Sequence, residues 1–74
     1  MLNYNNHIEI KPEIRFGKPV IKGTRISVSD ILSMLADNMS FAEILEDFPQ
    51  LEPDDIKACL QFASVNERIV AYAV

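Results

Sequence analysis

Cysteine, glycine and long apolar runs are all scarce in this chain of 74 residues. The single cysteine, Cys59, excludes an internal disulfide and argues against a zinc site, and its helical apolar surroundings favour a buried, inert thiol. No apolar run approaches the ~18 residues that a membrane-spanning helix needs, so we expect no membrane segment. The N-terminal residues are polar and lack the apolar core of a signal peptide, which together with the free thiol predicts a cytoplasmic protein.

Histidine is nearly absent, and no catalytic arrangement stands out. His7, the only histidine, lies in a polar N-terminal segment that we expect to be loose and solvated, and no cysteine, serine or aspartate stands at motif spacing from it. The pair Asp54-Asp55 fits the start of a helix, and the carboxylates between residues 43 and 47 fit the solvated face of another. We therefore expect no enzyme, no metal, no cofactor and no small-molecule substrate.

Basic residues are scarce beyond residue 25, which makes the charge distribution uneven. Residues 1–25 carry a net charge of +3, whereas residues 26–74 carry a net charge of −7. The basic segment suits phosphate or an acidic protein, and the acidic remainder repels nucleic acid and suits a basic partner. A chain of this size forms one domain with a small core, and such chains often gain stability by oligomerising, so we expect a homodimer.

The only two glycines frame a turn-rich, cationic segment, Gly17-Lys-Pro-Val-Ile-Lys-Gly-Thr-Arg-Ile26. Glycine suits backbone positions with positive φ, so Gly17 and Gly23 are predicted to be turn points with Val20-Ile21 extended between them. Three of the seven basic residues lie in this segment, namely Lys18, Lys22 and Arg25. The segment is either a structural arm or a contact surface.

Apolar residues before position 27 lack helical spacing. Ile8-Glu-Ile10 alternates at period two and predicts a short strand that Pro12 ends. The later apolar residues indicate irregular and short extended pieces whose side chains lie over the helices, and some of these pieces could pair as strands across a dimer. They are Ile14, Phe16, Val20, Ile21 and Ile26.

Three helices are predicted in residues 27–74 from their start and stop signals. The start signals are Ser27 or Ser29 with Asp30, the capping box Ser40-Phe-Ala-Glu43, and Pro53 followed by Asp54-Asp55. Asn38 suits a left-handed turn after the first helix, and Pro49 ends the second. We expect the third helix to run close to the chain end, with Ile56, Leu60, Ala63 and either Val65 or Glu67 on its apolar side. The whole chain, 1–74, is then one mainly α domain with an extended arm over residues 1–26.

The glycine-framed segment resembles the hallmark of the family called "domain of unknown function 433", where it leads into a short helical bundle. The resemblance continues through Val28-Ser-Asp-Ile-Leu32, the segment from Met39 to Pro49, and Leu51-Glu-Pro-Asp-Asp-Ile56, and covers residues 8 to 63. It implies a homeodomain-like helix-turn-helix fold. Some members resemble antitoxins that pair with PIN-like ribonuclease toxins. The family offers no catalytic residues to transfer to this chain.

The resemblance predicts the antitoxin of a type II toxin–antitoxin pair, which binds a PIN-like toxin and regulates its own transcription through DNA. The alternative is a structural or interaction module with no nucleic-acid role. Because the helices are acidic, we expect any DNA contact from Lys18, Lys22 and Arg25, although a structural ion pair is an equal alternative for Arg25. The candidates for toxin contact are Ile69, Val70 and Tyr72; the alternative is that these residues pack on the N-terminal arm or on a second copy.

Overall fold

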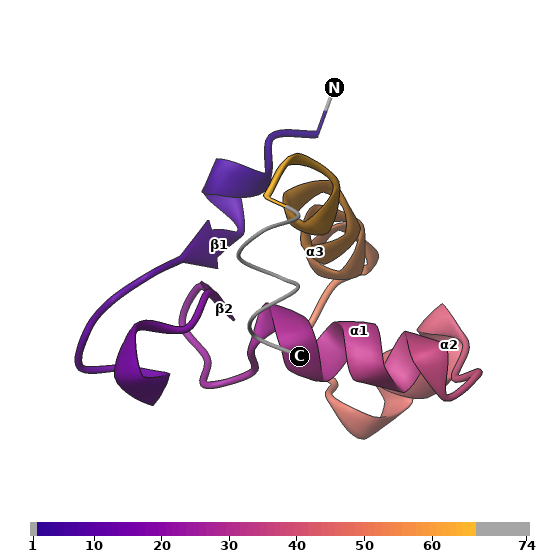
Figure 1. Cartoon of the computed structure of the whole chain (residues 1–74). Coiled ribbons are helices and arrows are strands. Elements are labelled where there is room, and N and C mark those ends of the chain that lie inside the picture. Colours follow the sequence, from indigo (N-terminus) through magenta and orange to yellow (C-terminus); the bar gives the residue numbers. More distant parts are fainter. Residues whose placement is uncertain (1, 67–74) are drawn as a thin grey trace.

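Three helices and a two-stranded hairpin make up residues 2–66, the part of the chain that this computed structural model describes (Figure 1). The elements are the 3-10 turn η1 (Tyr4–Asn6), β1 (Ile8–Glu9), a second 3-10 turn η2 (Arg15–Gly17), β2 (Val20–Ile21), α1 (Val28–Ala36), α2 (Phe41–Asp47) and α3 (Pro53–Val65). The predicted fold class is confirmed: the chain is mainly helical, with a short extended arm before the three helices.

The two strands pair within the chain, not across a dimer. They run antiparallel, with Ile8 opposite Ile21 and Glu9 opposite Val20. The chain then turns back at Gly23, whose φ of +76° is left-handed, so that the Ile21 amide donates to the Ile26 carbonyl at 2.9 Å. Gly17 has a φ of +81°. Both glycines are therefore turn points, as predicted.

The predicted helix signals hold at the first two helices. Ser27 caps α1, with reciprocal hydrogen bonds of 3.0 and 3.1 Å between Ser27 and Asp30. Ser40 and Glu43 form the predicted capping box of α2, with distances of 2.9 and 3.1 Å. Asn38 has a φ of 68°, the left-handed geometry expected for it between the two helices.

The third helix starts at Pro53 as predicted and ends at Val65. The prediction that it continues towards the chain end is wrong at Asn66, which has φ −124° and ψ 44°. The Asn66 backbone amide makes the last helical hydrogen bond, to the Phe62 carbonyl at 2.9 Å. The Asn66 side-chain amide donates to the same carbonyl at 3.2 Å, and side-chain bonds of this kind compete with helix propagation. Residues 67–74, over which the helix was also predicted to run, lie outside the part of the chain that the structure describes.

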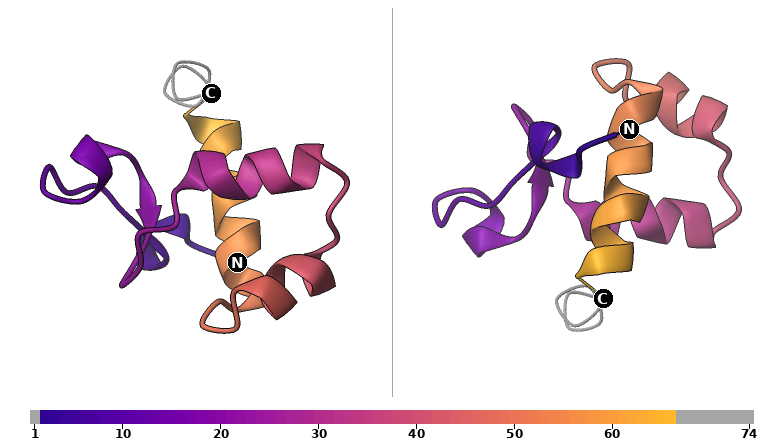
Figure 2. Two further views of the ribbon diagram at one scale, coloured as in Figure 1. Left: turned by 90° about the horizontal axis from the view of Figure 1, so that it is seen from below. Right: turned by 90° about the horizontal axis from the view of Figure 1, so that it is seen from above.

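The core joins the helices to the arm. One isoleucine from each helix is 0% exposed: Ile31 of α1, Ile44 of α2 and Ile56 of α3. The paired strand residues Ile8 and Ile21 belong to the same cluster. The base of the arm is therefore built into the fold, while the segment between the strands projects from it, on the opposite side of α3 from α2 (Figure 2).

The buried stripe of α3 lies beside the one predicted. Ile56, Cys59 and Phe62 face the core at intervals of three residues, whereas Leu60, expected to be buried, is 42% exposed. The reason is that both α1 and η1 pack against α3, and together they bury the side of α3 that carries Cys59. Burial raises the pKa of the Cys59 thiol to about 12, so the prediction of a buried, inert cysteine is confirmed.

Candidate interaction surface on the arm

The turn η2 holds three consecutive residues in left-handed geometry. The φ angles are 50° at Arg15, 58° at Phe16 and 81° at Gly17. The turn is closed by hydrogen bonds from the Gly17 amide to Ile14 at 3.1 Å and from the Lys18 amide to Arg15 at 3.2 Å. Left-handed geometry costs roughly 1–2 kcal/mol for each residue other than glycine. The tip of the arm is therefore a strained piece of backbone.

Phe16 stands on this strained turn with its side chain fully in solvent. Its exposure is 101% of the reference value, so the prediction that it covers the helices is wrong. The hairpin residues Ile8, Val20 and Ile21 provide that cover instead. A single exposed apolar residue is ordinary, but a bulky aromatic in left-handed geometry is rare, and strain of this kind concentrates at functional sites.

Arg15 fastens the turn to the start of α1. Its guanidinium donates to the Arg25 carbonyl at 2.8 Å and to the Asp30 carboxylate at 3.1 Å. Burial raises the pKa of Asp30, but hydrogen bonds from Ser27 and Arg15 outweigh it, so the pKa lies below its ordinary value of 3.8. This carboxylate therefore serves both the α1 cap and the arm.

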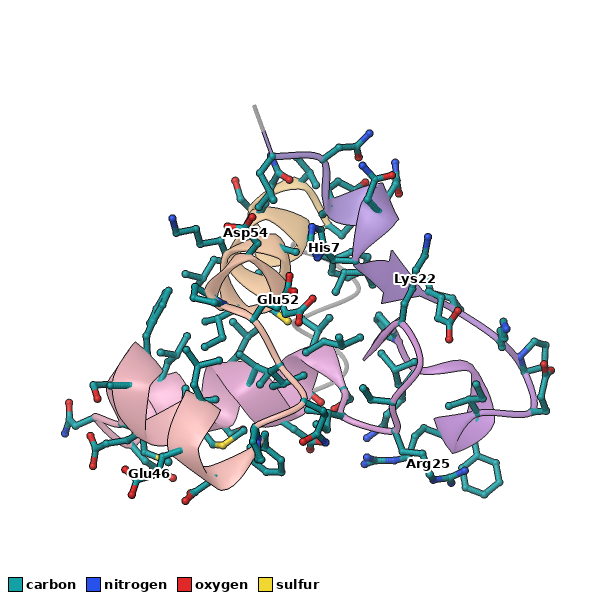
Figure 3. All side chains as sticks on the ribbon, turned by 180° about the vertical axis from the view of Figure 1, so that it is seen from behind. His7, Lys22, Arg25, Glu46, Glu52 and Asp54 are labelled. Atoms are coloured by element: carbon teal, nitrogen blue, oxygen red, sulfur yellow. The ribbon has the colours of Figure 1, made fainter. Side chains whose placement is uncertain are left out.

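The three predicted DNA-contacting residues are exposed, and two of them lie on different surfaces. Lys18, Lys22 and Arg25 form no ion pair with any residue in 2–66. Figure 3 places Lys22 and Arg25 on opposite sides of the arm. Of the two alternatives for Arg25, the structural ion pair is thus not made within the described part, because Arg15 pairs with Asp30 in its place.

His7 is not solvated, contrary to the prediction. Its Nδ1 lies 2.9 Å from the Asp55 carboxylate, and the two side chains are only 20% and 14% exposed. The cause is the preceding turn, where the Tyr4 ring meets Phe62 edge-on at 5.5 Å and the Tyr4 amide donates to Gln61 at 2.9 Å. No sequence pattern signals this contact, because 48 residues separate His7 from Asp55.

The helices carry mostly acidic side chains. Lys57 is the only basic residue between residues 27 and 66. Figure 3 shows Glu46 on α2, far from Lys22 and Arg25. In residues 27–66, the exposed carboxylates that form no ion pair with another residue of the described part are Asp37, Glu43, Glu46, Asp47, Glu52 and Asp54. Positive and negative charge therefore occupy different parts of the molecule.

Residues 2–66 offer neither a membrane-spanning helix nor a cluster of metal ligands. No helix there is long and apolar enough to cross a membrane. No group of three or more histidine, cysteine, aspartate or glutamate side chains in this part of the chain is placed to hold a metal ion. The predicted toxin-contacting residues Ile69, Val70 and Tyr72 lie outside the described part.

Comparison with known proteins assigns the chain to a family. Residues 8–63 match the family described as "Protein of unknown function (DUF433)". The chain belongs to this family. The match spans the arm from β1, the strained turn and all but the last two residues of α3. The resemblance predicted from the glycine-framed segment is thereby confirmed, with the same bounds.

A solved structure from the same family shares the fold of the DUF433 chain. A crystal structure of a DUF433 member from Anabaena variabilis superposes with a TM-score of 0.87 and 25% identity, over 92% of this chain and 67% of that one. An uncharacterized protein of Sinorhizobium fredii, y4eO, is 34% identical over 55 residues. That alignment covers 74% of this chain but 25% of the Sinorhizobium protein, so the chain spans about a quarter of the length of this curated relative.

The arrangement offers a binding surface on the arm. An aromatic ring in solvent can enter an apolar pocket, and the neighbouring ammonium and guanidinium groups can pair with carboxylates or phosphates. Lys18 follows two residues after Phe16, and Arg25 lies beside the turn because its backbone carbonyl accepts from the Arg15 guanidinium. We name the exposed group Phe16, Lys18 and Arg25 the arm tip.

Proposed function

We propose that this DUF433 chain is an antitoxin-like protein of a type II toxin–antitoxin pair, and that the arm tip binds the toxin. The observation that carries the proposal is the fully exposed Phe16 on its strained turn. Aromatic anchors that become buried on association supply much of the free energy of protein–protein binding. A turn already fixed by Arg15 also loses little conformational freedom when it docks.

The chemistry of the arm tip specifies the toxin surface. Phe16 requires an apolar pocket, and Lys18 and Arg25 require carboxylates around its rim. The family resemblance points to a PIN-like ribonuclease as the partner. The chain then acts by covering the toxin and performs no reaction of its own.

Co-expression of this chain with a PIN-like ribonuclease tests the proposal. We expect the two proteins to co-purify and the toxin's growth arrest to be relieved. Phe16→Ala should weaken the complex about 30-fold, as expected for removal of a central aromatic anchor. Leu60→Ala is the matched control, because Leu60 is also apolar and 42% exposed but lies on α3. Absence of a complex, or equal losses of affinity in the two variants, would contradict the proposal.

Binding of DNA by the arm is a second candidate function, favoured by the exposed and unpaired state of Lys18, Lys22 and Arg25 in the described part. The carboxylates of α2 oppose it, because they repel phosphate where a helix-turn-helix protein needs cations.

Salt-dependent binding to the upstream DNA tests this second function. If the arm cations bind phosphates, replacing each with alanine should lower the affinity and flatten the salt slope by roughly one unit for each phosphate that is no longer bound. Glu46→Gln should leave the affinity unchanged or raise it, because it removes repulsion. If the chain shows no salt-sensitive affinity for this DNA, either alone or with the toxin, it does not bind DNA and acts as the interaction module.

A further inference from the structure

We infer that, without a toxin, the arm tip of one copy docks on the acidic helices of a second copy, giving a symmetric dimer that exchanges arms. The inference rests on the proposed docking role of Phe16 but concerns a different partner. Two observations support it: the positions of the unpaired charges, and the separation of the arm from α2 within one molecule.

The arm carries an excess of unpaired positive charge. Lys11 pairs with Glu9 at 3.6 Å, and Arg15 pairs with Asp30 at 3.1 Å, so these cations are already neutralised. Within residues 10–26 this leaves three cations without an ion-pair partner in the described part, Lys18, Lys22 and Arg25, against the single acid Glu13.

The helices carry the complementary excess. The unpaired carboxylates that run from the end of α1 to the start of α3 include Glu46 and Asp47 on α2, and Lys57 is the only cation among the residues from 27 to 66. Glu43 is already engaged by its own cap, where the hydrogen bonds from Ser40 hold its pKa below the ordinary value. Carboxylates able to pair with Lys18 and Arg25 are therefore present on the chain itself.

One molecule cannot bring its own two surfaces together. In both views of Figure 2 the arm and α2 lie on opposite sides of α3. The arm and α2 of one molecule therefore do not meet, and a second copy can supply the contact.

Two-fold symmetry closes the assembly. If each arm docks on the partner's helices, one dimer contains two equivalent contacts and leaves no unmatched surface to recruit further copies. The exchange also buries Phe16, which nothing in the described part of its own chain covers. Because the toxin needs the same arm tip, toxin binding should dissociate the dimer.

A charge-exchange experiment on the purified chain tests the inference without any toxin. The arm-reversed variant carries Lys18→Glu and Arg25→Glu, and the helix-reversed variant carries Glu46→Lys and Asp47→Lys. All four positions are exposed, so both variants should keep their circular dichroism and melting behaviour. Each variant alone should be a monomer of 8.4 kDa by sedimentation, whereas an equimolar mixture should form dimers, because each arm then meets a helix of opposite charge.

Phe16 provides the second measurement. Phe16→Ala should raise the dimer dissociation constant about tenfold or more, and Phe16→Tyr should retain the dimer. A wild-type chain that is monomeric at micromolar concentration, a dimer insensitive to Phe16→Ala, or reversed variants that do not associate when mixed would each overturn the inference. Those results would leave toxin binding standing, and failure of the toxin to co-purify would leave the dimer standing, so the two proposals fail separately.

Discussion

The helices and the arm differ in how their backbone is stabilised. The first two helices begin at a serine whose hydroxyl accepts an amide hydrogen bond, and each helix buries an isoleucine that is 0% exposed. The turn η2 has neither a side-chain cap nor a buried side chain. It holds Arg15 and Phe16 at left-handed φ and is fastened through one guanidinium.

That difference assigns separate roles to the two regions. The helices combine good local geometry with burial, which is what a stable scaffold requires. The arm tip places strain, an exposed aromatic and unpaired cations together, a combination that lowers stability and raises binding capacity. Substitutions in the two regions should therefore differ in the size and even the sign of their effect on stability.

Removing core volume should separate the two regions most clearly. Ile56→Ala empties a site that is 0% exposed and should lower the free energy of unfolding by about 2–5 kcal/mol. Ile10→Ala, the same change on the arm at a residue 54% exposed, should stay within about 0.5 kcal/mol. Urea unfolding followed by circular dichroism measures both. Similar losses would mean that the arm carries as much of the stability as the helices.

A glycine in the arm should matter for its backbone alone. Gly23 has a φ of +76°, and a Cβ built there would meet nothing within 4 Å. Gly23→Ala therefore should destabilise by about 1 kcal/mol or more through left-handed strain without any clash. Thermal unfolding tests this, and an unchanged melting temperature would show that the turn relaxes around alanine at no cost.

The opposite sign is expected at Phe16. Its side chain is 101% exposed, so Phe16→Gly loses no burial and relieves a φ of 58°. We expect a gain of up to about 1 kcal/mol, reduced by the greater freedom of glycine in the unfolded chain. The same variant should lose toxin binding. A protein that becomes more stable while losing its partner would identify the strain as functional, whereas a loss of stability would show that Phe16 supports the fold.

Local signals can be predicted from the sequence, and contacts across the fold cannot. The capping box of Ser40 and Glu43 and the left-handed Asn38 each depend on residues within one turn, so spacing identifies them. Arg15 and Asp30 are 15 residues apart, and their ion pair exists only because the hairpin returns the chain to α1. The sequence offers no means of telling which of the two nearby arginines, Arg15 or Arg25, makes it.

The sequence predicts the candidate surface only in part. It identifies the cations of the glycine-framed segment, and they are exposed. It misplaces Phe16, because apolar residues in an irregular segment normally cover the core, and the geometry that turns this one outward occupies two residues other than glycine. Such positive φ values at Arg15 and Phe16 contradict residue preferences, so only the surrounding structure can impose them.

Acid should weaken the hydrogen bonds that Asp30 makes between the arm and α1. The pKa values of Asp30 and Glu43 lie below their ordinary 3.8 and 4.5 in the folded chain, so both carboxylates stabilise it above those values. That contribution is lost as the pH falls through the folded pKa values, below about pH 4. Asp30→Asn should lower stability at pH 7 and flatten the acid loss, as urea midpoints at pH 7 and 3 would reveal. An identical acid profile in the variant would exclude Asp30 as a contributor.

The smallest effect is expected where the N-terminal turn rests on α3. His7 contacts Asp55 through its ring, and its backbone carbonyl accepts the Lys22 amide at 2.8 Å. His7→Ala removes only the ring contact, for a partly exposed pair, and should cost about 0.5 kcal/mol of global stability.

The sharper measurement is hydrogen exchange at the Lys22 amide, which should lose protection if the ring contact holds β1 in place. Protection at the Cys59 amide, in the middle of α3, should stay unchanged, because local opening of the arm need not open the core. Equal losses of protection at both amides would show that arm and helices unfold as one unit, and the contrast between them would then concern charge alone.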